Sequence, residues 1–243
     1  MAEALNYQEL ARRYGLEPIP ESVLRLTQIV AKQDADIQEV AGVIAKDPAL
    51  ATRLLRGANP HARTEADYEI RTVDEALLRN GMGGALLLAM GTPLALALVK
   101  TFQTMLSLKL DSIDPNSAVP LAGQHLLGTI GFSGKAAGMV FLRLSLAAAA
   151  EVASRMLGLD PQELSEPGVV NDTVGELLNI TTGNFKSNLC DAGLNCRLQP
   201  PRVSQTTDFA APTMAGTMLE RMAFRAGRTV VFVDVRVNPW NDE

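Results

Sequence analysis

The 243-residue sequence is poor in the residues from which most metal and nucleophilic sites are built. It has only two histidines, His61 and His125, in unrelated contexts, which excludes a hydrolytic metal site built from several histidines. The two cysteines, Cys190 and Cys196, are too few for a disulfide framework, and their spacing fits no zinc pattern. No stretch fits a G-x-x-x-x-G-K phosphate loop or a G-x-S-x-G nucleophile turn. The common hydrolytic sites are therefore not expected on this chain.

The charge balance and the N-terminal residues exclude further classes. The formal net charge is −5, and 47% of residues are hydrophobic and 20% charged, which is typical of a soluble globular protein. An acidic chain lacks the basic footprint of a nucleic-acid-binding protein, so no nucleic-acid partner is expected. The first residues contain neither the basic region nor the apolar region of a secretory signal. We therefore expect a cytoplasmic protein.

One long uncharged stretch, residues 81–99, admits two interpretations. Its length suits a membrane-spanning helix. Alternatively, two buried helices meet at Gly91-Thr92-Pro93, where Thr92 would cap the second helix and Pro93 would be its first residue. The glycines and the proline within the stretch, and the absence of flanking basic clusters, argue against a single span. No membrane span is expected.

The first 90 residues predict a series of short helices. Apolar residues recur at helical spacing after Pro20, and Asp36, Asp47 and Thr72 each stand where a helix cap is needed. No strand pattern interrupts these helices. Residues 1–91 are therefore predicted to form a small all-α region.

From residue 92 onward, the sequence alternates between helices and β-hairpins. The expected elements are a hairpin over 128–145, a helix over 146–158, a helix from about Pro167 to Gly193, and a hairpin of residues 217–224 and 229–237. Their order predicts an α+β domain over residues 92–243, with helices packed on an antiparallel sheet. For residues 111–127, a strand and a loop both remain open.

The long helix of this domain carries polar side chains in one row. Asp172, Glu176 and Asn179 follow at intervals of four and three, which makes them neighbours on a helix surface. Gly183 and Lys186 continue the same row. Glycine inside a helix costs about 1 kcal/mol relative to alanine, a cost most easily understood if another molecule comes close at Gly183. The alternative is a plain solvated face, because exposed polar stripes are common on helices.

The chemistry of this row suits only particular reactions. An asparagine amide can hold and orient a water molecule through one donor and one acceptor, and a carboxylate can pair with a partner's lysine. Neither group is a strong base. They would suit a hydrolysis whose electrophile and metal ion come from another molecule, with catalysis mainly by positioning. An acyl phosphate on a partner protein fits this description.

The stretch VVNDTVGELLNITTGNFKSNL resembles the signature helix of the CheC/CheX/FliY family of chemotaxis phosphatases, and that of CheX-type members most of all. The family pattern is Asp or Ser, three residues, Glu, two residues, Asn, and a later Pro. Asp172, Glu176, Asn179 and Pro201 occupy these places. The resemblance covers roughly residues 92–243 and includes the glycine-rich hairpin and the valine-rich last strand.

The resemblance implies dephosphorylation of a CheY-like response regulator. Asn179 would orient the attacking water, Glu176 would pair with the regulator's lysine, and Asp172 would support them, with Gly183 and Lys186 in the contact surface. The regulator would supply the aspartyl phosphate and the magnesium ion, so no cofactor is expected on this chain. CheX-type members tend to pair, so a homodimer is expected. The alternative is a non-catalytic adaptor that binds receiver domains through the same helix.

Residues 17–90 resemble the start of an HD-related output (HDOD) domain. The segments EPIPESVLRLTQIV, IQEVAGVIAKDPALATRLLRGANP and IRTVDEALLRNG match its first helices in order. A complete domain of this kind is about twice as long, and no His-Asp dipeptide occurs in the sequence. The metal chemistry of true HD proteins is therefore not expected. A docking or signalling module and a helical appendage that only packs against the second domain both remain open.

Overall fold

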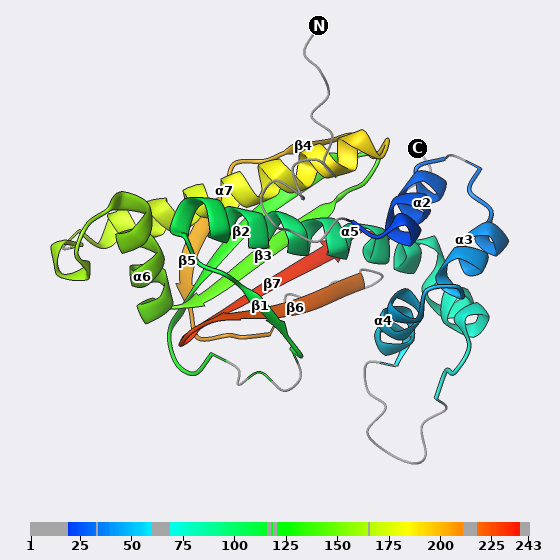
Figure 1. Ribbon diagram of the computed structural model, residues 1–243, viewed down its shortest axis with the longest axis horizontal. Coiled ribbons are helices and arrows are strands. Elements are labelled where there is room, and N and C mark those ends of the chain that lie inside the picture. The colour runs from blue at the N-terminus through cyan, green and yellow to red at the C-terminus, as the bar shows by residue number, and fades with distance from the viewer. Residues whose placement is uncertain are drawn as a thin grey trace, which may run out of the picture.

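The computed structural model describes residues 19–32, 34–59, 69–115, 118, 121–164, 166–210 and 218–238 (Figure 1). Its elements are α2 (Glu21–Val30), α3 (Ile37–Ile44), α4 (Pro48–Ala58), α5 (Val73–Leu106), β1 (Asp111–Ile113), β2 (His125–Gly134), β3 (Gly138–Ser145), α6 (Leu146–Leu157), η1 (Pro161–Glu163), α7 (Pro167–Asp191), β4 (Cys196–Leu198), β5 (Arg202–Thr206), β6 (Met218–Ala226) and β7 (Thr229–Val237). Helices α5 and α7 cover one face of the sheet, and α2 to α4 gather at one end of the molecule (Figure 1). The α+β class and the helical N-terminal region are confirmed.

The short N-terminal helices begin at the caps that the sequence predicts. The Asp36 side chain accepts a hydrogen bond from the backbone of Gln38, and Asp47 caps α4 through the amides of Ala49 and Leu50. The Ser22 hydroxyl also donates to Asp47, and this hydrogen bond is the main reason why the pKa of the Asp47 carboxyl is lowered. The contact ties the start of α2 to the start of α4.

Helix α5 is interrupted at a different place from the one that the sequence predicts. The two helices that were predicted to meet at Gly91-Thr92-Pro93 form one helix through Pro93, and the break lies at Gly81, with φ 59° and ψ −163°. A proline inside a helix removes one backbone hydrogen bond. Here Arg53 of α4 donates to the Thr92 hydroxyl and to the Leu88 carbonyl, while its guanidinium and the Glu220 carboxylate occupy the space beside Gly91. Tertiary contacts thus stabilise the helix where local signals predict an end.

The same helix is long and apolar enough to cross a membrane by length and composition alone. Its most apolar 18-residue window has a mean hydropathy of 1.9, but 67% of that window is buried inside the protein. Helix α5 packs against α2, α3 and α4 and also against α7, β6 and β7. Its apolar residues are thus used in the core. The helix runs through residue 91, where the two expected domains divide, and this division stays a prediction.

The sheet is antiparallel, with strand order β1-β6-β7-β3-β2-β4 and with β5 also paired to β2. The two expected hairpins are confirmed as β2–β3 and β6–β7. The undecided segment 111–127 contains the short strand β1 and then a connection to β2, of which the structure describes residues 114, 115, 118 and 121–124. The alternating valines of β7 are all buried against the helices: Val231, Val233, Val235 and Val237.

On the opposite face of the sheet, Ala118 and Phe209, from the segments that follow β1 and β5, pack in one apolar cluster with Phe232 of β7. Arg143 of β3 is fully buried and donates to Asp234 of β7, to which Arg221 of β6 also donates. Burial lowers the pKa of the Arg143 guanidinium, and the Asp234 charge opposes this shift. The carbonyl groups of Phe209 and Ala210 accept further hydrogen bonds from the two arginines. These contacts hold residues 209 and 210 against the sheet.

Candidate functional site

Helix α7 lies beside α5 and packs on the strands β2, β4 and β5 (Figure 1). It starts at Pro167, as the sequence predicts, and ends two residues before Gly193. One side of it is apolar and at most 1% exposed, and consists of Val174, Leu177, Leu178, Phe185 and Leu189. This burial holds the helix rigidly against the sheet and leaves its opposite side free.

The polar row lies on that free side. Asp172, Glu176 and Asn179 are all exposed, and their side chains form no hydrogen bond or ion pair with any other residue that the structure describes. Helix neighbours at these spacings have Cβ atoms about 5–6 Å apart. A rigid helix therefore presents two carboxylates and one carboxamide, closely spaced and without internal partners.

Several other polar side chains of α7 have partners within the protein. The hydroxyl groups of Thr173 and Thr182 donate to carbonyl groups one turn earlier, at 2.7 and 2.8 Å. The Asn184 amide donates to the Thr101 hydroxyl of α5 at 3.3 Å. Two of the four asparagines of this helix thus have different surroundings: Asn184 joins two helices, and Asn179 points to solvent.

Gly183 continues the row without a packing reason of its own. A Cβ atom at this position would meet no atom within 4 Å, whereas one at Gly175 would lie 3.5 Å from Val203 of β5. The protein itself therefore leaves room for a side chain at Gly183. Solvent or another molecule can occupy this space, so the place of Gly183 in a contact surface stays a prediction.

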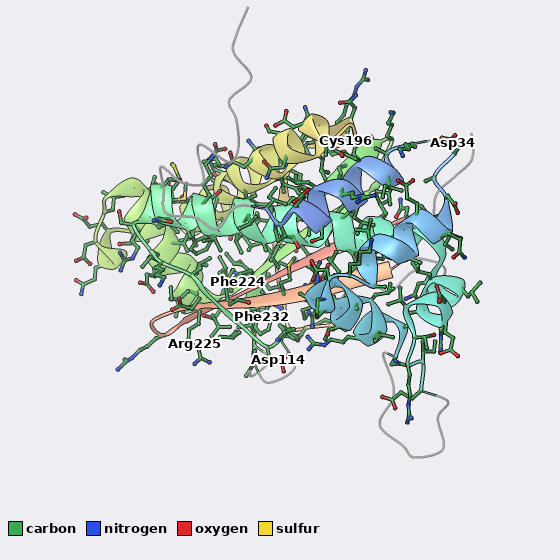
Figure 2. The ribbon with its side chains drawn as sticks, turned by 45° about the vertical axis from the view of Figure 1, so that its right-hand side comes forward. Asp34, Asp114, Cys196, Phe224, Arg225 and Phe232 are labelled. Carbon is green, nitrogen blue, oxygen red and sulfur yellow. The ribbon has the colours of Figure 1, made fainter. Side chains whose placement is uncertain are left out.

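Two neighbouring elements border the row. Strand β5 contacts α7 through Val203, and Pro201, the last member of the sequence pattern, directly precedes this strand. At the far end of α7, Cys196 lies at the start of β4 (Figure 2). Burial raises the pKa of the Cys196 thiol, and the nearby Cys190 raises it further, while the charge of Lys186 opposes both effects. Lys186 thus stands at the β4 end of the row, half-buried and close to that thiol.

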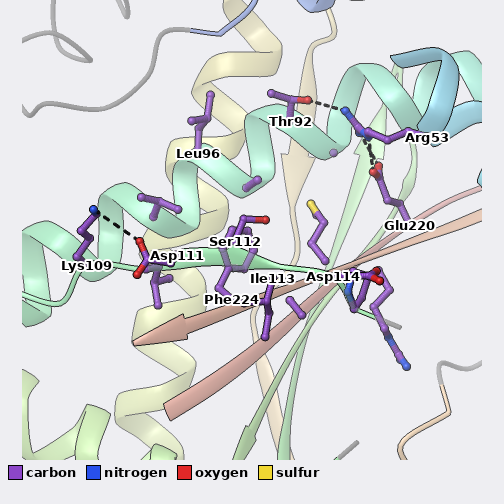
Figure 3. A pocket seen from close by; sticks show the side chains of 18 of the residues that line it. Arg53, Thr92, Leu96, Lys109, Asp111, Ser112, Ile113, Asp114, Glu220 and Phe224 are labelled. Atoms are coloured by element: carbon purple, nitrogen blue, oxygen red, sulfur yellow. Dashed lines mark hydrogen bonds and ion pairs between the residues drawn. The ribbon is translucent and has the colours of Figure 1, made fainter. Parts of the chain in front are cut away.

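The structure also contains a cavity that no sequence pattern indicates. A cavity of about 990 Å³ opens between α4, α5, β1 and β6 (Figure 3). Its lining residues come from residues 53–115, which hold α4, α5 and β1, and from the distant residues 220–224 of β6, so no local pattern could indicate it. Among the described residues, no group of three or more His, Cys, Asp or Glu side chains is placed to hold a metal ion.

Two family models match different parts of the chain. Residues 126–220 match the family described as chemotaxis phosphatase CheX, and residues 16–114 match the HDOD domain. The first match contains the whole of α7 and its polar row. The second continues through α5 and beyond residue 90, where the resemblance was expected to end. No curated protein matches the chain.

Solved structures show the same fold over the C-terminal part. CheX from Vibrio vulnificus is 24% identical, with a TM-score of 0.53, over 61% of this chain and 96% of that one. A CheC-like superfamily protein from a Shewanella species is 23% identical, with a TM-score of 0.52, over 60% and 96% of the two chains. CheX in a complex with CheY, BeF3 and Mg²⁺ from Borrelia burgdorferi is 17% identical, with a TM-score of 0.50, over 61% and 97%. The resemblance to CheX and CheC-like proteins is confirmed.

Proposed function

We propose that this chain, which joins a CheX-like α+β region to a preceding HDOD-like helical region, dephosphorylates the aspartyl phosphate of a CheY-like response regulator. The observation that carries the proposal is the row on α7, where the exposed side chains of Glu176 and Asn179 stand one turn apart and have no partner among the residues that the structure describes. The CheX family match contains this helix. The complex from Borrelia burgdorferi pairs a CheX with a CheY, which supports a receiver as partner.

Asn179 would act by positioning. Its amide can accept a hydrogen bond from a water molecule and donate one to the phosphoryl group, which aligns the water oxygen with phosphorus. The water oxygen forms a new bond to phosphorus as the bond between phosphorus and the regulator's aspartyl oxygen breaks; the carboxylate stays on the regulator, and the protons of the water leave with inorganic phosphate or pass to solvent. The magnesium ion would belong to the regulator and would neutralise charge on the phosphoryl oxygens. This chain needs neither a nucleophile nor a metal ion for such a step.

Glu176 would set the register of the complex. A carboxylate one turn from the amide can pair with a lysine of the receiver while Asn179 reaches the phosphoryl group. Asp172 would support this contact from the preceding turn. The open space at Gly183 would let the receiver approach the helix backbone, and Lys186 would lie at the end of the contact surface.

A turnover measurement separates an enzyme from an adaptor. The phosphorylated receiver is supplied in large excess over the full chain, and the released phosphate is followed with time. We expect many phosphates per chain and a rate proportional to the chain concentration. An adaptor would bind the receiver and leave the decay rate unchanged, even when the chain is in excess.

The homodimer and the cytoplasmic location that the sequence predicts are part of this proposal. Light scattering on the purified chain measures directly whether it forms a homodimer. A monomer that remains active in the turnover assay would remove the dimer from the account without affecting the roles of Glu176 and Asn179.

A further inference from the structure

Strand β5 lies next to α7 and runs in the opposite direction (Figure 1). A Cβ atom at Gly128 of β2 would lie 3.1 Å from the Leu178 side chain of α7, and further along both elements the ring centroids of Phe132 and Phe185 are 6.0 Å apart. Helix α7 therefore runs parallel to β2. Because β5 pairs antiparallel with β2, it runs antiparallel to α7.

Alternate side chains of β5 point toward α7. Val203 lies 3.5 Å from the position of a Cβ atom at Gly175. Gln205 pairs with Leu126 of β2, a buried residue of the core beneath the helices, and therefore points to the same face of the sheet as Val203. The Gln205 side chain is exposed and has no hydrogen-bond partner within the described chain. It thus offers a free amide beside the helix.

The dimensions of the two elements place Gln205 next to Asp172. Two residues of a strand span about 6.7 Å, and four residues of a helix rise about 6 Å. Counted from the contact between Val203 and Gly175, Gln205 therefore comes level with the first turns of α7. Asp172 lies there, turned about 60° from Gly175 and thus on the side of the helix that borders β5. The carboxylate at the start of the polar row and the amide of β5 belong to one surface.

The surface between the polar row and β5 has the composition of a protein interface. By the same count, Pro201 comes level with Asn179, and the side chains of Pro201 and Val203 are both half-buried. Specific interfaces combine an apolar centre with a polar rim. Here the apolar centre lies beside Asn179, and Gln205 stands at its polar rim.

We propose that a CheY-like receiver rests on both elements, with the polar row of α7 at its phosphorylation site and Gln205 of β5 as a further residue that determines which receivers bind. The inference rests on the proposed receiver partner but not on catalysis, since an adaptor would use the same surface. The Gln205 amide forms hydrogen bonds with the receiver at the rim of the contact. A contact of this kind is made in the bound state and in the transition state alike, so it sets affinity and leaves the chemical step unchanged.

Chemical protection of an introduced thiol tests the contact directly. Gln205→Cys and, as a matched control, Ser204→Cys are made in the full chain, and alkylation at each introduced thiol is followed by mass spectrometry. Ser204 is also exposed, but it pairs with Leu127 and points to the opposite face of the sheet. A CheY-like receiver of the same organism, loaded with BeF3 and Mg²⁺ and present at about ten times its dissociation constant, should slow alkylation of the Gln205→Cys variant about tenfold and leave the Ser204→Cys variant unchanged. Equal alkylation rates at position 205 with and without the receiver would overturn the inference.

Steady-state kinetics separates this contact from the reaction itself. Gln205→Trp introduces a residue type that strands favour, and it should raise the KM for the phosphorylated receiver at least about tenfold while kcat stays within about twofold. Ser204→Trp should leave both constants unchanged. If the wild-type chain binds the receiver without turnover, the proposed phosphatase activity fails, and the protection experiment still decides the inference. If turnover occurs and Gln205→Trp leaves KM unchanged, the inference fails and the phosphatase activity stands.

Discussion

Helices α5 and α7 lie side by side on the same face of the sheet, yet they use their surfaces differently (Figure 1). Helix α5 is surrounded by protein along residues 84–91, all of them buried. Helix α7 is buried along one side only and presents an ordered polar row on the other. The comparison shows that one helix packs against both parts of the molecule, while the other exposes a row of polar groups, which the proposed function assigns to a partner.

The largest effect is expected from damage to α5. Phe102 is fully buried, and Phe102→Ala should lower the free energy of unfolding by about 3–5 kcal/mol, because it removes apolar contacts and leaves a cavity. Urea denaturation measures the loss. The exposed Thr104→Ala on the same helix should change stability by less than about 0.5 kcal/mol. A similar small loss for Phe102→Ala would contradict the role of α5 as the central core helix.

The second-largest effect is expected on α7, and it concerns the binding of a receiver and not the stability of the fold. Glu176→Gln keeps the shape of the side chain and removes its charge, so it should weaken binding of a phosphorylated receiver by about 1–2 kcal/mol and reduce its salt dependence. Unfolding should be unaffected, because the carboxylate has no partner within the described chain. Calorimetric titration at two salt concentrations provides the measurement. Unchanged affinity at both would exclude the proposed lysine pair.

The contact between the two helices should have an intermediate effect on stability. Asn184→Ala removes the hydrogen bond to Thr101 and should cost about 0.5–1.5 kcal/mol of unfolding free energy. Thermal unfolding is a suitable readout. A neutral result would mean that packing alone holds α7 against α5.

The smallest expected effect is an increase in stability. Gly183→Ala should raise the free energy of unfolding by about 0.5–1 kcal/mol, because alanine is the better helix former and the structure has room for its Cβ atom. Gly183→Leu should also fold but should bind the receiver more weakly, since its side chain would project into the space left for the partner. If the leucine variant binds as tightly as the alanine variant, the receiver does not approach the helix at this position.

Local patterns were sufficient to predict α7. Its apolar and polar sides follow from helical periodicity, so the exposure of Asp172, Glu176 and Asn179 could be read from spacing. The hairpins and the helix caps at Asp36, Asp47 and Thr72 were predicted for the same reason: their signals lie within a few residues of the structure that they cause.

Features that depend on distant residues could not be predicted. Helix α5 continues through Pro93 because Arg53 and Glu220, from two other elements, pack against Gly91 and Thr92. The cavity between α4 and β6 is lined by residues that are far apart in the chain. The roles of Glu176 and Asn179 also depend on a second molecule, and they remain a prediction.

The most direct measurement compares alanine variants of Asn179 and Asn184, both on α7, in the rate of phosphate loss from a phosphorylated receiver. Asn179→Ala should reduce the acceleration by at least about 100-fold, the size of effect found when a positioning or transition-state contact is lost, with unchanged thermal stability. Asn184→Ala should retain the acceleration and lose stability. The account is contradicted if Asn179→Ala accelerates phosphate loss as well as the wild-type chain does.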